Sequence, residues 1–384
     1  MDTTPATPEP RARPDRHWLS LPVGWLLGLK KWGKLVLIYL GGRPPAGQVR
    51  VSYEHQRIPA PPGVMVGGMV KFVPLKQILP HSPWRFNILY LGSSTLPRDL
   101  PELIRLARRK GAKIVLNQNG VGYPAWAGAD WQTVNRPMQA ALKEADYIFY
   151  QSEFCKRSAD HFLGPGRGAW EILYNPVDTD FFRPAPAPFP SHELVLLQAG
   201  TAKSFYRFET GVRTLGELCR RGLKARLMVA GHLAWDDRPQ KSLAEAQGLL
   251  EQLGLRDLVT LLPPYSRSEA PTIFQQAHIM LHTKVNDPCP AVVLEALACG
   301  LPVVYAQSGG VPELVGPEAG IGVPDRANWE ADIPPDPAGL ADAVTRVWEK
   351  WPEYSRAART RAAEKFDLKP WLERHREVFA RLVQ

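Results

Sequence analysis

The sequence predicts two α/β domains, each built on a parallel sheet and joined by a proline-rich linker. The chain has 384 residues, which is more than one comfortable core holds and suits two domains. Hydrophobic residues make up 45% and charged residues 22%, as in ordinary globular enzymes. Short β-rich runs alternate with amphipathic stretches in both halves, which predicts helices covering both faces of a parallel sheet. The stretch 181–193, rich in proline, separates the halves.

The first half contains five strand-like runs and three helix-like stretches. One helix is expected over 98–111, where Leu103, Leu106 and Ala107 recur at helical spacing and Gly111 ends the pattern. The expected strands are 49–55, 87–94, 113–120, 146–153 and 171–176, and the other helices are 134–145 and 154–164. The order of these segments predicts repeated strand–helix–strand units.

The second half restarts the same alternation after the linker. The expected strands are 194–200, 224–231, 258–265, 278–285, 302–306 and 320–324, with helices over 209–222, 243–254, 271–277 and 291–299. Residues 338–384 are expected to be helical, and 371–383 to run back across the joint between the domains. No repeat at the level of sequence links the halves, so the duplication is one of architecture.

The net charge of +9 is concentrated at the front of the chain. Residues 1–50 hold eight Lys or Arg against three Asp or Glu, so the body is nearly balanced. This distribution favours an anionic surface met by the N-terminus, and no nucleic-acid motif is present. The four cysteines are scattered without a CxxC pair, which supports neither a zinc site nor a disulfide framework and indicates reduced thiols in the cytoplasm.

Residues 18–42 form an apolar segment interrupted by lysines. Lys30, Lys31 and Lys34 break the run below the length of a spanning helix, and no secretory cleavage site follows it. Trp18 and Trp25 stand seven residues apart, as in a helix that lies in a membrane interface. Packing of this helix on the body of the protein explains the same pattern, so both readings remain open.

The stretch 286–310, "NDPCPAVVLEALACGLPVVYAQSGG", places two carboxylates eight positions apart after an expected strand. Asp287 precedes a helix and Glu295 lies one turn inside it. The first helical amides, from Ala291 and Val292, attract anions. Gly309 and Gly310 lack a Cβ and allow backbone to approach a ligand closely. Such a pocket suits a phosphorylated, polyhydroxylated ligand.

A purely structural explanation of the same residues is available. Asp287 would be an N-cap, and Glu295 a solvated acid favoured by the helix dipole. On spacing alone this explanation is the stronger one.

The motif and two further stretches resemble a known family. "DPCPAVVLEALACGLPVV" followed by "SGGVPE" is similar to the E-x7-E signature of retaining GT-B glycosyltransferases of family 4, which use nucleotide-sugar donors. The stretches 145–164 and 170–184 resemble the strand, helix and closing segment of that family's first domain. The likeness covers most of 49–384. It implies two Rossmann-like domains that face each other across a cleft, with a C-terminal helix crossing back.

The resemblance also implies roles for the acidic pair and its neighbours. Glu295 would hold the donor ribose, and Asp287 would contact the transferred sugar in place of the family's first Glu. Asp is one methylene shorter than Glu, and Pro288 and Cys289 replace the usual Gly and Phe. Pro288 removes one amide donor, so the sugar pocket departs from the family pattern.

Three other stretches complete the implied site. Arg207 and Lys203 would bind the donor diphosphate and stabilise the leaving group without metal. Gly67 and Gly68 resemble the loop that approaches the diphosphate, although a simple tight turn explains them nearly as well. Asn119 stands where the family often has a His, and it can hydrogen-bond a sugar hydroxyl but cannot shuttle a proton.

The expected organisation follows from these assignments. Residues 1–45 form a basic tail and amphipathic segment, 46–187 an acceptor domain, 188–360 a donor domain and 361–384 a crossover helix. The expected activity is transfer of a sugar from a nucleotide diphosphate sugar to a glycan or lipid-linked acceptor, with no cofactor and no nucleic acid. The expected location is cytoplasmic or peripheral at the inner face of a membrane. A GT-B protein that binds sugar nucleotides without turnover, and a nucleotide-sugar epimerase, are the alternatives.

Overall fold

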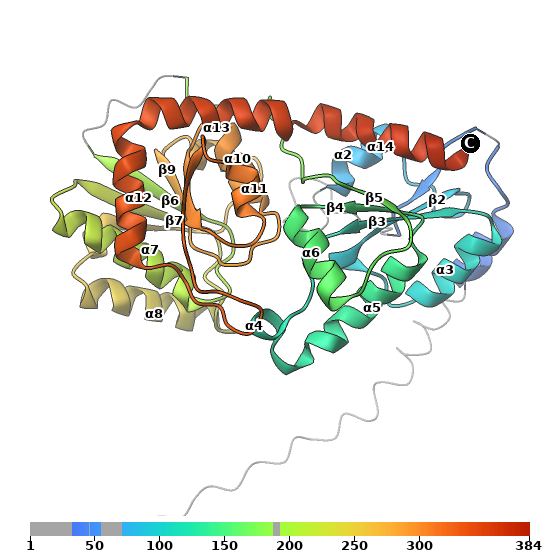
Figure 1. Cartoon of the computed structure of the whole chain (residues 1–384), viewed down its shortest axis with the longest axis horizontal. Coiled ribbons are helices and arrows are strands. Elements are labelled where there is room, and N and C mark those ends of the chain that lie inside the picture. Colours follow the sequence, from blue (N-terminus) through green and yellow to red (C-terminus); the bar gives the residue numbers. More distant parts are fainter. Residues whose placement is uncertain (1–32, 46, 55–70, 187–192) are drawn as a thin grey trace, which may run out of the picture.

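The computed structural model describes residues 33–45, 47–54, 71–186 and 193–384. Two α/β domains lie side by side, and two long C-terminal helices run along both of them (Figure 1). The prediction of two parallel-sheet domains is confirmed. Most of the segment 18–42, together with Gly67 and Gly68, lies outside the described residues.

The N-terminal domain holds a five-stranded parallel sheet in the order β1-β2-β3-β4-β5. Its strands are β1 (Val51–Ser52), β2 (Ile88–Gly92), β3 (Lys113–Gln118), β4 (Tyr147–Tyr150) and β5 (Ala169–Ile172). Its helices are α2 (Phe72–Ile78), α3 (Leu100–Arg109), α4 (Pro124–Ala127), α5 (Trp131–Glu144) and α6 (Glu153–Phe162). The central strands β2 and β4 are buried along their whole length, as expected for a sheet covered on both faces. Gly111, at φ +74°, follows α3 as predicted.

The C-terminal domain holds a six-stranded parallel sheet in the order β11-β10-β9-β6-β7-β8. Its strands are β6 (Leu194–Ala199), β7 (Ala225–Ala230), β8 (Val259–Leu262), β9 (Ile279–His282), β10 (Val303–Ala306) and β11 (Gly320–Val323). Its helices are α7 (Phe205–Arg220), α8 (Pro239–Gln252), α9 (Ala270–Phe274), α10 (Ala291–Ala298), α11 (Val311–Val315) and α12 (Pro337–Glu349). Successive strands are added on one side of β6 up to β8 and on its other side from β9 onward, so the strand order reverses between β6 and β9. Ligands bind at such a reversal in open α/β sheets.

Two consecutive helices connect the domains along one edge of the molecule, at the top of Figure 1. α13 (Trp351–Lys365) packs on α10 of the C-terminal domain, and α14 (Leu368–Val383) continues over the N-terminal sheet (Figure 1). Trp371 and Phe379 of α14 join the N-terminal core, and His375 is 2.9 Å from the hydroxyl of Tyr90 on β2. The predicted segment 371–383 corresponds to α14, which packs on the core of the first domain.

The loop between β11 and α12, residues 324–336, also crosses between the domains. Trp329 packs against Tyr123, Phe154 and Phe162 of the N-terminal domain. The backbone N–H of Ala125 donates to the carbonyl of Trp329 at 2.9 Å. This proline-rich loop therefore ties the C-terminal domain to the first domain on the side opposite α14 (Figure 1).

The described end of the amphipathic segment, residues 33–40, is helical and has two faces. Ile38 is fully buried, and Lys34 pairs with Glu54 and Asp99. The opposite face leaves four large apolar side chains 49–70% exposed, namely Val36, Leu37, Tyr39 and Leu40. One face thus packs on the first domain while the other is open to solvent. In the part of the chain described, no helix has the length and apolar character needed to span a membrane.

Candidate functional site: a cleft between the two domains

The carboxyl ends of both sheets border a cavity of about 580 Å³ between the domains. Its N-terminal wall includes Ser93, Asn119, Tyr123 and Trp126, and its C-terminal wall includes Lys203, Lys284, Asn286, Asp287, Pro288 and Cys289. Parallel strands place their following loops at one edge, which explains why residues so distant in sequence meet here. The cavity therefore gathers Asn119, Lys203 and Asp287, three of the residues singled out in the sequence.

Asp287 is 9% exposed and already has two partners. Its carboxylate lies 2.9 Å from Nζ of Lys284 and 3.2 Å from Nε2 of His282. Burial alone would raise the pKa of Asp287, but Lys284 and then His282 outweigh it and hold this pKa well below its usual range. Burial lowers the pKa of His282, so the imidazole is neutral, and its Nε2 lies beside the carboxylate without another partner. Asp287 is therefore an ionised, oriented acceptor at the cavity wall.

Gly309 and Gly310 support the Asp287 loop. A Cβ on Gly309 would lie 2.5 Å from the carbonyl oxygen of Asp287, and one on Gly310 would lie 2.0 Å from that of Pro288. The N–H of Gly310 also donates to the carbonyl of Asp287 at 2.9 Å. The close approach that these glycines allow is thus to the protein's own backbone.

Glu295 lies one turn inside α10, as the spacing predicts. The N-cap of α10 is Pro290, without a side-chain hydrogen bond, so Asp287 does not cap this helix. The amides of Ala291 and Val292 open the helix and have no partner within it. Val292 also lies beside the end of β6, since a Cβ on Gly200 would contact its side chain at 3.5 Å. The start of α10 and the loop after β6 therefore face the same space.

The environment of the Glu295 carboxyl is unusual for an acid. Glu295 is partly exposed, and its neighbours include Tyr265 and Arg267 from the loop after β8. Burial raises the pKa of Glu295 to about 7, and the charge of Arg267 opposes this rise only in part. A carboxyl group whose pKa is raised this far is typical of a binding or catalytic position.

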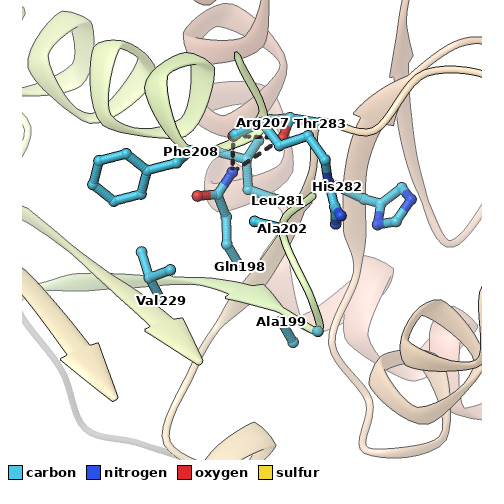
Figure 2. A pocket seen from close by; sticks show the side chains of 10 residues that line it. Gln198, Ala199, Ala202, Arg207, Phe208, Val229, Leu281, His282 and Thr283 are labelled. Atoms are coloured by element: carbon cyan, nitrogen blue, oxygen red, sulfur yellow. Dashed lines mark hydrogen bonds between the residues drawn. The ribbon is translucent and has the colours of Figure 1, made fainter. Parts of the chain in front are cut away.

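Arg207 occupies the start of α7 with its guanidinium in a small pocket (Figure 2). Gln198 and Thr283 both donate to the carbonyl of Arg207 at 2.8 Å and fix this turn. The guanidinium donates to the carbonyl of Thr201, while its Nε is buried without a hydrogen-bond partner. Among the described residues no carboxylate lies within ion-pair distance of Arg207, and burial lowers the pKa of Arg207. This partly exposed cation, with its Nε buried and unpartnered, is positioned for an anion that the described residues do not supply.

Asn119 ends β3 on the N-terminal side of the cavity. Its N–H donates to the hydroxyl of Ser93 at 2.9 Å, and its side-chain oxygen is buried without a partner. Gly120, the next residue, packs against the ring of Pro288 from the other domain. The neighbouring Asn117 turns away from this cavity to accept from Lys71 and Gln151, both at 2.6 Å. Asn119 is therefore the amide that faces the cleft.

Sequence reasoning missed several residues that the fold brings to this cleft. His282 and Lys284 could have been found, because they end β9 within five residues of Asp287. Tyr123 carries no local signal, because only the fold places it at the cavity. Lys71 and Glu313 lie at the joint between the domains outside this cavity, and the Glu313 carboxylate accepts from backbone N–H groups of the first domain.

The comparisons with known proteins match this geometry. Residues 182–365 match the family model of glycosyl transferases group 1. The segment includes β6 to β11, Arg207, Asp287 and Glu295, hence the whole C-terminal side of the cleft. A D-inositol 3-phosphate glycosyltransferase of Mycobacterium bovis is 29% identical over 188 residues, which are 46% of this chain. The chain spans 37% of the length of that curated relative.

Solved structures resemble the two-domain arrangement as a whole. Anabaena HepE in complex with UDP has a TM-score of 0.63 at 18% identity, covering 77% of this chain and 79% of its own. Sucrose-phosphate synthase from Thermosynechococcus elongatus has a TM-score of 0.61 at 17% identity, covering 78% and 74%. These likenesses show the fold, which is GT-B as the resemblance implied.

Proposed function

We propose that this protein is a glycosyltransferase that moves a sugar from a nucleotide diphosphate sugar to an acceptor hydroxyl. The observation that carries the proposal is Arg207, a partly exposed cation whose Nε is buried without a hydrogen-bond partner and which has no carboxylate within ion-pair distance among the described residues. The diphosphate of such a donor supplies the missing negative charge. The match to glycosyl transferases group 1 over 182–365 and the UDP-bound state of HepE, a protein of the same fold, support this assignment.

Each side of the cleft has a part in the proposed reaction. Glu295 in its ionised form accepts from the ribose hydroxyls, and Asp287, oriented by His282 and Lys284, accepts from hydroxyls of the transferred sugar. Arg207 and Lys203 neutralise the charge that develops on the diphosphate as the sugar leaves, which requires no metal. Asn119 offers its buried, unpartnered side-chain oxygen to the sugar from the other domain.

Retention at the anomeric carbon is part of the proposal. Asp287 is held by two partners and Glu295 is assigned to the ribose, so neither carboxylate serves as a covalent nucleophile in this proposal. Departure and attack on one face of the sugar is the route that fits, with a diphosphate oxygen taking the acceptor proton. The acceptor is a glycan or glycolipid of a surface polymer or glycoconjugate.

The exposed face of helix 33–40 supports peripheral membrane contact at the cytoplasmic side. Val36, Leu37, Tyr39 and Leu40 expose apolar side chains on one helix, and the sequence that precedes this helix is rich in Lys and Arg. A lipid-linked acceptor would then be delivered to the first domain.

A screen of nucleotide diphosphate sugars for nucleotide release tests the function. The wild-type protein is expected to release nucleotide from one donor, faster when an acceptor is added, and Glu295→Gln to release much less. Nucleotide binding without release by the wild type would favour the alternative of a binding protein. The departures of this chain from the family pattern at Asp287, Pro288 and Asn119 are the reason for testing that alternative. Interconversion of the donor sugar without release would favour an epimerase.

A further inference from the structure

A second cation, Lys71, lies buried at the joint between the domains. Lys71, at the N-cap of α2, is 6% exposed. Its Nζ donates to Oδ1 of Asn117 at 2.6 Å, and no carboxylate among the described residues pairs with it. Burial lowers the pKa of Lys71 to about 8. An ammonium group has three donors, so Lys71 has capacity left for a ligand.

A chain of buried amides fixes Lys71 against the other domain. Oδ1 of Asn117 also accepts from Gln151 at 2.6 Å, and Gln151 in turn accepts from Nδ2 of Asn175 at 2.8 Å. Nδ2 of Asn175 further donates to the carbonyl of Cys289 at 3.0 Å. Because Cys289 belongs to the Asp287 loop, the position of the Lys71 head group depends on the two domains being together.

Lys71 lines a cavity of about 50 Å³ that both domains share. The other lining residues are Pro74, Asn175, Pro176, Asp178, Arg267, Ala291 and Leu368. Lys71 and the free amide end of α10 at Ala291 contribute positive charge, as does Arg267, an exposed residue whose guanidinium also lies over the rings of Phe181 and Phe182. Among the described lining residues, Asp178 is the one acid. The volume exceeds that of a single water probe and is small enough for one oxyanion group.

We propose that this cavity is an anion subsite of the donor site, in which Lys71 and Arg267 hold an anionic oxygen of the nucleotide sugar between the domains. The inference rests on the proposed function. Two sources on the donor share this chemistry: a phosphate oxygen of the diphosphate and the carboxylate of a sugar acid. Arg207 and Lys203 already match the two charges of a diphosphate, so the second source would mean a donor that carries a uronic acid.

The test is calorimetric titration of the full chain with matched probes. UDP, GDP and ADP are compared with their nucleosides, and UDP-glucose is compared with UDP-glucuronate. The variants are Lys71→Met, Lys71→Arg and, as the control on the same helix, Lys76→Met. Lys76 has no side-chain partner among the described residues and does not line the cavity. The melting temperature of each variant is measured beside its titration. Lys71→Met is expected to fold, because Lys71 has no ion pair among the described residues that the substitution would break.

The two sources give different results. If a phosphate oxygen occupies the subsite, Lys71→Met weakens the binding of the preferred nucleoside diphosphate about tenfold to 100-fold and leaves its nucleoside unchanged. If a sugar carboxylate occupies it, the variant spares the diphosphates and weakens UDP-glucuronate alone. Lys71→Arg should recover part of either loss, and Lys76→Met should match the wild type.

Two outcomes would overturn the inference. Equal binding of every probe by Lys71→Met and the wild type, with nucleotide release intact in both, would remove the subsite and leave the proposed function standing. A wild type that neither binds any probe nor releases nucleotide in the donor screen would remove both proposals.

Discussion

The carboxylate of Glu313 accepts hydrogen bonds from the backbone N–H groups of Glu153 and Phe154 at 2.7 and 2.9 Å. Glu313 belongs to α11 of the C-terminal domain, whereas Glu153 and Phe154 begin α6 of the N-terminal domain. An acid of one domain thus caps a helix of the other, where the helix dipole favours negative charge. This contact, with the Trp329 loop, holds the cleft closed on one side.

Loss of this cap should favour an open arrangement of the domains. Glu313→Ala removes two charge-assisted hydrogen bonds, so we expect about a tenfold to 100-fold loss of the closed form. Small-angle scattering should show a larger radius of gyration, and hydrogen exchange should be faster at the start of α6. Glu318→Ala is the control, because that side chain is 64% exposed and lies 3.7 Å from Arg361. Identical scattering of Glu313→Ala and the wild type would show that other contacts keep the domains closed.

Glu295→Gln should separate binding from stability. The amide accepts less strongly than a carboxylate from ribose hydroxyls, so kcat/KM for the donor should fall about tenfold to 100-fold. The melting temperature should change little, because Glu295 is partly exposed and only the charge of Arg267 opposes the desolvation of its carboxyl. Initial rates of nucleotide release and thermal unfolding measure the two effects. A large loss of stability with unaltered specific activity would instead make Glu295 a structural residue.

The raised pKa of Glu295 gives donor binding a pH dependence. The carboxyl is neutral below its pKa of about 7 and ionised above it, and the ionised form accepts hydroxyls better. Nucleoside affinity should therefore be about tenfold higher at pH 8 than at pH 6. The same shift makes the folded state bind this proton more tightly than the unfolded state, whose pKa is 4.5. The free energy of unfolding should thus fall between about pH 4.5 and pH 7, and Glu295→Gln should lose both dependences.

Arg207→Met should lower turnover without a cost in stability. The wild-type side chain is partly exposed, lacks an ion-pair partner among the described residues and has a buried, unsatisfied Nε. Its removal should leave the melting temperature unchanged or raise it, since an unpaired and partly desolvated charge destabilises the free protein. The rate of nucleotide release should fall about 100-fold. Arg213→Met is the matched control on α7, because Arg213 forms an exposed pair with Glu209. A clear drop in melting temperature for Arg207→Met would contradict the anion-site interpretation.

Helix 33–40 should contribute to the binding of anionic vesicles. Leu37→Ser with Leu40→Ser replaces two side chains that are 49% and 70% exposed, so folding should be unaffected. Sedimentation with phosphatidylserine vesicles should show several-fold weaker binding than the wild type. Leu243→Ser, at a 41% exposed site on α8, is the control. Unchanged binding of the double variant would exclude this face from membrane contact.

Local patterns were sufficient for much of the architecture. The alternation of β-rich and amphipathic runs predicts both parallel sheets, because side-chain periodicity is a property of each segment alone. Glu295 lies one turn inside α10, Gly111 and Gly300 end their helices at positive φ, and Arg207 stands in the first turn of α7. These features depend on neighbours within a few residues, so the order of amino acids decides them.

The chemistry of the cleft depends on contacts between distant segments. Asp287 owes its ionised state to Lys284 and His282, and Glu295 its raised pKa to burial. Lys71 owes its place to three amide side chains, Asn117, Gln151 and Asn175, the last of which donates to the other domain. Gly309 and Gly310 read as ligand-contacting glycines in the sequence, and only the fold shows that they accommodate the Asp287 loop. The electrostatic environment, the burial and the interdomain contacts of a residue depend on groups from the whole folded chain. For that reason the residue types of the site were visible in the sequence, whereas their protonation, partners and closure were decided by the tertiary structure.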